Sequence, residues 1–126
     1  VLYVELAGQS FLLTGDVEGE GELLLTTQLL EREISHVTML KVAHHGSKYS
    51  TSERFLEALD ADVAVISCGL NNWYGHPHEE TLQRLKKDGS VILTTPHHGA
   101  ITVKVYGDGK MLISSWEEDA KPAVVR

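Results

Sequence analysis

The feature that most constrains this chain is an apolar run, residues 37–43, that ends in His44-His45-Gly46-Ser47. Its length and aliphatic content predict a short buried strand that opens into two imidazoles, a glycine and a hydroxyl. Two other stretches end in a similar way, because Asp16 follows Leu12-Leu13-Thr14-Gly15 and His76 lies in Tyr74-Gly75-His76-Pro77. Three junctions between strand and loop therefore offer one aspartate and several histidines, which are metal-binding side chains.

Strand-like and helix-like patterns alternate along the chain. Alternating and continuous apolar runs predict strands at residues 1–6, 10–14, 37–43, 63–67, 91–93, 100–106 and 111–115. Apolar spacing and capping residues predict helices at residues 23–34, after a capping box at residues 50–53, and from Pro77 to Gly89. We expect α/β (α+β) layers over residues 1–116, with a mixed sheet and flanking helices. Residues 117–126 are predicted to be a flexible tail.

Size and charge limit the class of protein. The 126 residues are enough to form the hydrophobic core of a single domain. The single Cys68 excludes an internal disulfide. No apolar stretch approaches the roughly 18–20 residues of a membrane span, so we expect a soluble segment without direct membrane contact. The chain starts within a predicted sheet and without Met, and we expect it to be the later part of a longer protein.

The formal net charge of −7 bears on possible partners. It argues against a broad basic surface of the kind that wraps a nucleic acid backbone. It is compatible with a metal site that binds phosphate locally, because a bound divalent cation can be the largest charge in such a site.

Each candidate side chain also has a purely structural explanation. Asp16 could be a turn residue, because the preceding glycine lets the chain turn sharply. Neighbouring side chains of an extended strand point to opposite faces, so one of His44 and His45 is expected to reach the site while the other packs or orients it. Both could instead be surface residues. The hydroxyl of Ser47 is a predicted catalytic group, useful for binding an oxyanion. Carboxylate and imidazole together suit Zn, Mn or Fe.

The positions of the remaining histidines are inferred from the prolines that lie next to them in the sequence. His76 precedes Pro77, which suits the first position of a helix, so His76 is expected at the helix cap beside the positive helix end. There it could bind a metal, donate a proton to a leaving oxygen or contact phosphate, and ordinary capping is the alternative. His78 is expected to face solvent. His97 and His98 follow a proline and are predicted to lie in a turn as a loop pair.

Taken together, these motifs resemble the metallo-β-lactamase superfamily and, within it, the ComEC-type domain of bacterial DNA-internalisation competence proteins. The resemblance covers about residues 1–106. It is carried by Phe11-Leu12-Leu13-Thr14-Gly15-Asp16, Leu40-Lys41-Val42-Ala43-His44-His45-Gly46-Ser47, Ser50, Val65-Ile66-Ser67-Cys68-Gly69, Asn72, Tyr74-Gly75-His76-Pro77, Leu82 and Gly99-Ala100-Ile101. It implies that the chain forms the C-terminal half of an αββα sandwich.

The resemblance also implies roles for individual residues. In that family the Thr-Gly-Asp aspartate is a metal ligand, and a histidine of His-His-Gly-Ser completes the second metal. Asp16, His44 and His45 are accordingly the predicted metal-binding residues, for divalent Zn or Mn, two per complete domain. His76 is predicted to be catalytic near the scissile phosphate. The family's His-x-(His/Asp)-x-Asp-His motif does not occur in this sequence, and Pro96 removes a carboxylate that relatives carry.

Competing functions follow from these motifs. The first is the C-terminal portion of a metal-dependent phosphodiesterase or nuclease that acts on DNA or another phosphodiester. The chain alone is predicted to be inactive, because a catalytic metal needs about three protein ligands and half of the shell is missing. The second is a non-catalytic fragment that forms homodimers through an exposed sheet edge. A β-lactam or thioester hydrolase fits less well. The resemblance implies a soluble domain of a bacterial membrane protein, on its extracytoplasmic face.

Overall fold

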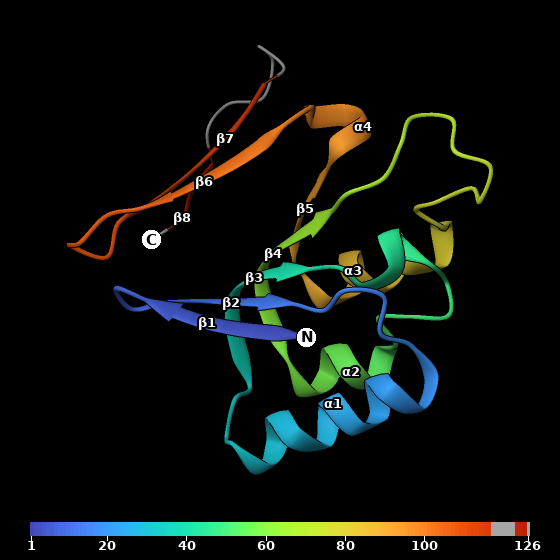
Figure 1. The fold of residues 1–126 in the computed structure, drawn as a ribbon, viewed down its shortest axis with the longest axis horizontal. Coiled ribbons are helices and arrows are strands. Elements are labelled where there is room, and N and C mark those ends of the chain that lie inside the picture. The colour runs from blue at the N-terminus through green and yellow to red at the C-terminus, as the bar shows by residue number, and fades with distance from the viewer. Residues whose placement is uncertain (117–122, 126) are drawn as a thin grey trace.

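The computed structural model describes residues 1–116 and 123–125 (Figure 1). The strands are β1 (Leu2–Leu6), β2 (Gln9–Leu13), β3 (His36–Lys41), β4 (Asp60–Ile66), β5 (Val91–Thr94), β6 (Ile101–Val105), β7 (Met111–Ser115) and β8 (Ala123–Val125). The helices are α1 (Gly19–Glu31), α2 (Glu53–Ala58), α3 (Glu79–Asp88) and α4 (Thr95–His98), with a 3-10 turn η1 (Ala43–Gly46). The mixed α/β content that the sequence predicts is confirmed.

The larger sheet has the strand order β1-β2-β3-β4-β5. β1 and β2 form the predicted antiparallel hairpin, and β2, β3, β4 and β5 are parallel. Because these four strands run in one direction, their carboxyl ends meet along one edge of the sheet. Ligand sites of open α/β sheets are built at this edge. The topology therefore gathers the loops that follow β2, β3, β4 and β5.

The two faces of the sheet are covered by different layers. Successive strand residues point to opposite faces, so Leu12, Leu40 and Ala64, which are register partners, lie in one row. This face packs against α1, α2 and α3, through Leu25, Leu29, Phe55, Leu56 and Leu85. The opposite face packs against a smaller antiparallel sheet, β6-β7-β8, through Val63, Val65, Met111 and Ile113. The result is three layers: helices, mixed sheet and small sheet (Figure 1).

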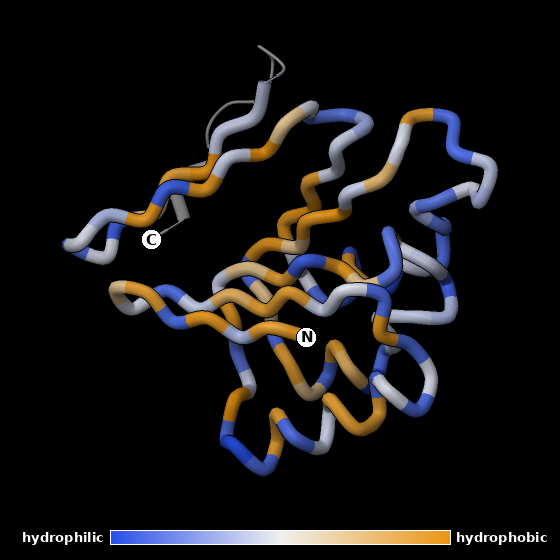
Figure 2. The backbone as a smooth tube through the Cα atoms, viewed as in Figure 1, coloured by the Kyte–Doolittle hydropathy of each residue, from blue (hydrophilic) through white to orange (hydrophobic). Residues whose placement is uncertain are grey.

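Coverage of both faces explains why the strands were visible as continuous apolar runs. Figure 2 shows mostly hydrophobic residues along the strands of the larger sheet. A strand buried on both sides has no need of alternating polar residues. The runs at residues 63–67 and 91–93 accordingly form β4 and β5, and the closing hairpin forms β6 and β7.

Several predicted boundaries were wrong, and capping explains most of them. α1 begins at Gly19, before the first leucine, and has glutamates in its first turn, which favourably complement the helix dipole. The cap of α2 is Ser52, whose Oγ accepts from the N–H of Phe55 at 3.2 Å, so the cap lies two residues beyond the expected Ser50. α3 begins at Glu79, with His78 at its N-cap. His76 is therefore not the cap residue.

The segment predicted to be a flexible tail is described only in part. Residues 123–125 form β8 and pair with β7, and the rest of residues 117–126 lies outside the described residues. Among the described residues, no helix combines the length and apolar content needed to cross a membrane.

Candidate functional site

The predicted site residues lie in loops at the carboxyl edge of the larger sheet. Asp16 follows β2, His44 and His45 follow β3, and His76 lies in the connection from β4 to α3. The first two loops are joined directly, because the N–H of His44 donates to the carbonyl of Gly15 at 2.9 Å. Residues that are far apart in sequence are thus brought together by the parallel strand order.

The two adjacent histidines do not lie on an extended strand. β3 ends at Lys41, and His44 and His45 have left-handed backbone angles, with φ of 46° and 57°. This conformation is uncommon for residues other than glycine and clusters at functional sites. Their ring centroids lie 5.7 Å and 6.5 Å from that of His76. The extended strand that was assumed for His44 and His45 was therefore wrong, and both rings lie near His76; which of the two binds a metal stays a prediction.

Hydrogen bonds fix one nitrogen of each ring. His45 Nδ1 lies 2.6 Å from the carbonyl oxygen of Ser67, and His44 Nδ1 lies 2.8 Å from a carboxylate oxygen of Glu18. Both partners are acceptors, so Nδ1 donates in each contact, and Nε2 is the nitrogen that can face a cation. Histidines that bind metals almost always have such a partner on the other nitrogen. His44 and His45 are thus both arranged as ligands are.

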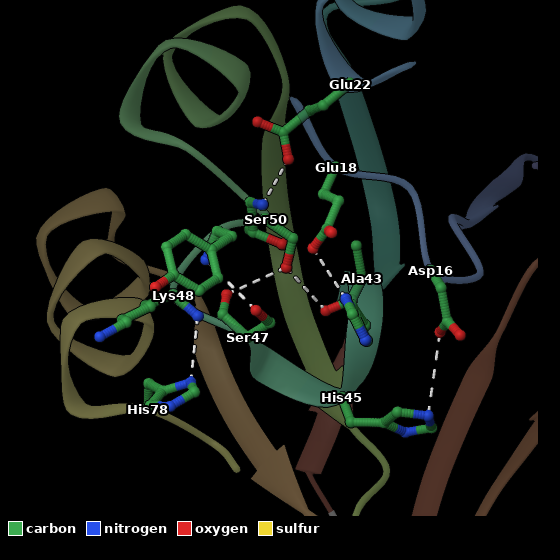
Figure 3. Close-up of polar contacts among 12 residues, drawn as sticks. Asp16, Glu18, Glu22, Ala43, His45, Ser47, Lys48, Ser50 and His78 are labelled. Carbon is green, nitrogen blue, oxygen red and sulfur yellow. Dashed lines mark hydrogen bonds and ion pairs between the residues drawn. The ribbon is translucent and has the colours of Figure 1, made fainter. Parts of the chain in front are cut away.

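Asp16 faces one of these free nitrogens. His45 Nε2 and Asp16 Oδ1 lie 3.8 Å apart (Figure 3), which is too long for a hydrogen bond. Two ligands of one ion, each bonded at about 2.1 Å, can lie at most about 4.2 Å apart, so the pair fits around a single cation. Within the described part of the chain, no group of three or more acidic, histidine or cysteine side chains could hold a metal. Among the described residues, Asp16 and His45 are thus a pair of possible ligands and not a complete ligand group.

Gly46 brings the His-His-Gly turn against the Gly-His-Pro loop. Its φ is +84°, and a Cβ at this position would lie 2.6 Å from the Cβ of Pro77. The carbonyl of Gly46 also accepts from the N–H of His78 at 2.9 Å. Only glycine satisfies both the backbone conformation and the close approach.

His76 is held by the side chain of Asn72. Asn72 Oδ1 accepts from the N–H of His76 at 2.9 Å, and Asn72 Nδ2 donates to the carbonyls of His76 and Gly69. The ring of Tyr74 stacks on that of His76, with centroids 5.6 Å apart. Burial and three neighbouring histidines lower the pKa of His76. This imidazole is therefore fixed in position and tends to be neutral at pH 7.

His78 does not simply face solvent, as was expected. It is partly buried, its ring centroid lies 4.8 Å from that of His76, and its Nδ1 accepts from the N–H of Lys48 at 3.1 Å (Figure 3). His97 and His98 lie in the short helix α4 and not in the predicted turn. His98 Nδ1 accepts from the N–H of Thr94 at 3.0 Å.

The loop that follows Gly46 is clamped from both sides. Buried Glu22, in α1, accepts from the N–H groups of Thr51 and Ser52, and Figure 3 shows its carboxylate directed toward the backbone of this loop. Arg84, in α3, donates through Nε to the carbonyl of Thr51 at 2.9 Å and through Nη2 to that of Ser50 at 2.9 Å. Charged groups are strong hydrogen-bonding partners for backbone atoms. The loop is thus positioned by contacts within the chain.

Ser47 belongs to this same loop. Its side chain is buried, and Oγ accepts from the N–H of Tyr49 at 3.3 Å. Its carbonyl accepts from the hydroxyl of Thr81 at 2.9 Å. These contacts describe a role in shaping the loop, and the catalytic role of the Ser47 hydroxyl stays a prediction.

Sequence analysis missed three residues that support the site. Glu18 and Glu22 precede the helix predicted at residues 23–34, Arg84 lies in the helix predicted from Pro77 to Gly89, and the sequence analysis assigned none of them a role. For Glu18 the sequence does hold a signal, because a carboxylate two residues after a predicted aspartate ligand can orient a neighbouring histidine. For Glu22 and Arg84 no local pattern indicates their distant backbone partners.

The chain is similar to segments of three bacterial proteins. It is 42 % identical over 107 residues to ComE operon protein 3 of Bacillus subtilis, a match that covers 80 % of this chain and 13 % of that protein. It is 37 % identical over 108 residues to Recombination protein 2 of Haemophilus influenzae, with 86 % and 13 % covered. It is 38 % identical over 101 residues to Competence protein ComA of Neisseria gonorrhoeae, with 80 % and 14 % covered. No protein-family model matches the chain.

These similarities support a link to competence proteins of the type that the motifs resemble. The chain spans only 13–14 % of the length of these three relatives.

Proposed function

We propose that this chain is the C-terminal portion of a metal-dependent phosphodiesterase or nuclease of the ComEC competence type, built on a metallo-β-lactamase αββα sandwich. The observation that carries this proposal is the geometry of His45, whose Nδ1 is bound to the carbonyl of Ser67 while Nε2 faces Asp16 at 3.8 Å. The parallel arrangement of His44 with Glu18 supports it. So does the similarity to a relative named for competence.

The residues fit a divalent cation, Zn or Mn, as part of its shell. Asp16 and His45, which lie 3.8 Å apart, would hold one ion, and His44 would contribute to the second ion of the complete domain, since carboxylate and imidazole are suitable donors for either metal. When bound, the cation supplies Lewis acidity toward a phosphoryl oxygen and lowers the pKa of water. His76, whose backbone is held by Asn72, lies beside these ligands, where the N–H of its neutral imidazole would hydrogen-bond to the leaving oxygen of the phosphodiester.

Metal binding by this chain is the first test. We expect calorimetric titration with Zn²⁺ or Mn²⁺, and elemental analysis of the purified chain, to show bound metal that Asp16→Ala removes. Asp108→Ala is the matched control, because Asp108 is an exposed aspartate in the turn between β6 and β7. Absence of metal binding by the unaltered chain would overturn the proposed ligand set.

Activity is the second test. Because the chain provides only two or three ligands, we expect no hydrolysis of bis(p-nitrophenyl) phosphate with either metal. Turnover that is lost on Asp16→Ala would contradict this expectation. A longer protein that supplies a His-x-(His/Asp)-x-Asp-His motif should gain metal-dependent activity that requires His76, and full activity of His76→Ala would remove its proposed role.

A second candidate function is self-association, and the exposed edge of the sheet favours it. β1 is the outermost strand at one side of the described sheet, and the side chains of Leu2 and Leu6 are each 55 % exposed. An open apolar edge strand is a template for pairing with another chain. We therefore propose a second copy of this chain as the partner, paired along β1.

Sedimentation velocity distinguishes this candidate. A dimer should dissociate on Val4→Lys, which places a charge in β1, and persist on Val91→Lys, which does the same in the opposite edge strand β5. A monomer at all concentrations would exclude self-association.

A further inference from the structure

Three large aromatic side chains lie exposed beside the histidine cluster. Trp73, in the connection from β4 to α3, is fully exposed, and Tyr74 and Tyr49 are 77 % and 71 % exposed. Figure 1 shows that the connection from β4 to α3 extends away from the body of the molecule. An exposed aromatic residue that stands alone needs no explanation, but several at one edge of a sheet indicate an interaction surface.

Contacts link these side chains across the histidine cluster. The rings of Tyr74, His76 and His78 follow one another, with centroid distances of 5.6 Å and 4.8 Å. His78 Nδ1 in turn accepts from the N–H of Lys48 (Figure 3), and Lys48 Nζ lies 5.3 Å from the ring centroid of Tyr49. Tyr74 and Tyr49 therefore belong to one connected row of side chains that includes His76.

The loops that carry this row differ in charge from the rest of the chain. The chain contains 18 acidic residues, but none lies within residues 42–52, 67–78 or 95–100. The same ranges contain six of the seven histidines, together with Lys48. An anionic chain can therefore approach these loops although the formal net charge is −7.

The carboxylates nearest to these loops come from other elements. Asp16 and Glu18 follow β2, and each lies against a histidine, at 3.8 Å and 2.8 Å. Glu79 and Glu80 lie in the first turn of α3, where the positive end of the helix dipole offsets part of their charge. The surface thus has aromatic rings and little fixed positive charge, so stacking and not phosphate neutralisation must supply most of its affinity.

We infer that Tyr49, Trp73 and Tyr74 form a stacking surface for the unpaired bases of a single-stranded nucleic acid. Exposed aromatic rings bind unstacked bases of any sequence, whereas the bases of a duplex are already stacked and paired. Binding of a duplex depends mainly on many basic groups at its phosphates, and these loops provide few. The inference rests on the proposed function and adds that the strand is unpaired where it meets the site.

A lipid bilayer is the other large partner that exposed Trp and Tyr side chains can bind. Two observations favour the nucleic acid. Tyr74 stacks on His76, so a bilayer over the aromatic side chains would cover the predicted catalytic group. The residues before Trp73 are Asn71 and Asn72, which are polar and poorly suited to insertion among lipid chains.

Fluorescence anisotropy with labelled oligonucleotides tests the surface in the intact chain, with EDTA present to prevent turnover. The probes are a thymidine strand of about 12 nucleotides, within the usual size of single-strand sites, its duplex with the complement, and an abasic strand of equal length. We expect the thymidine strand to bind at least about tenfold more tightly than the other two probes, because both lack unstacked bases. Equal affinity for the abasic strand or for the duplex would overturn the inference, as would absence of binding.

Variants identify the rings that stack. Trp73→Ala and Tyr49→Ala should each weaken binding of the thymidine strand about 5- to 150-fold, and Trp73→Phe, which retains a ring, should weaken it less. Both side chains are exposed, so the fold should be retained, which circular dichroism checks. Tyr106→Ala is the matched control, because Tyr106 is an exposed tyrosine that directly follows β6, and it should leave the affinity unchanged. Unchanged affinity in both alanine variants of the surface would overturn the assignment.

Cosedimentation with phosphatidylglycerol vesicles tests the lipid alternative. We expect no binding, and vesicle binding that Trp73→Ala removes would overturn the inference in favour of a membrane surface. The outcome is also separable from that of the proposed function. Metal binding by Asp16 without preference for the single strand would overturn only the stacking surface. Preference for the single strand without metal binding would overturn only the proposed metal chemistry.

Discussion

Replacement of Gly46 by alanine tests whether the two histidine loops depend on their close contact. Two separate costs are expected. The backbone of Gly46 has φ +84°, where an L-residue costs about 1–2 kcal/mol. The added Cβ would lie 2.6 Å from the Cβ and 3.1 Å from the Cα of Pro77, and such overpacking costs about 1–3 kcal/mol more. Gly46→Ala should therefore lower the free energy of unfolding by about 2–5 kcal/mol.

Gly89 provides a matched control for the backbone cost. It has φ +90°, and a Cβ there would have no atom within 4 Å. Gly89→Ala should therefore show only the first cost, so the two variants should differ by about 1–3 kcal/mol. Urea unfolding followed by circular dichroism measures both, with equal m-values as the check that the comparison is valid. Equal destabilisation of the two variants would refute the argument that Pro77 requires glycine at position 46.

Three further predictions concern the residues around the site and the end of α3. Glu22→Ala leaves the buried N–H of Thr51 without an acceptor and should cost about 1–3 kcal/mol in urea unfolding, whereas Glu22→Gln, which retains an acceptor, should cost less. Burial raises the pKa of Asp88, so its ionised form is disfavoured in the folded chain and opposes folding above the folded pKa. Asp88→Asn should therefore raise the free energy of unfolding by about 0.5 kcal/mol at pH 7, because the negative charge of Asp88 also lies at the C-terminus of α3. This increase should vanish as pH falls below the ordinary pKa of an aspartate carboxyl group, where Asp88 is uncharged in both the folded and the unfolded chain. Asn72→Ala should raise the hydrogen-exchange rate of the His76 amide at least about fivefold, as measured by NMR.

The sequence was sufficient to predict the layers because their physical cause is local. Apolar runs such as residues 63–67 are continuous where a strand is covered by helices on one face and by the small sheet on the other. The parallel order of β2 to β5 then follows, because the segments that connect these strands contain helices and are too long to be hairpin turns. With parallel strands, Asp16, His44 and His76 must lie at one edge, whatever their exact conformations.

The local geometry of the site could not be predicted in the same way. The alternation rule applied to His44 and His45 failed because the chain leaves the strand at Lys41 and turns into a left-handed conformation. That conformation is stabilised by partners elsewhere, since Glu18 and Ser67 each hold one ring. Their identity depends on tertiary structure that no short pattern encodes.

The residues that hold the loops have a further consequence for how a cation would bind. Glu22 and Arg84 bind backbone groups of the loop after Gly46, and Asn72 binds the backbone of His76. All these contacts join groups of the chain itself, so the conformational entropy of ordering these loops is lost during folding. The arrangement proposed for Asp16 and His45 therefore rests on contacts within the folded chain. For this reason the arrangement of His45 and Asp16 is informative about chemistry even where the chain alone is expected to be inactive.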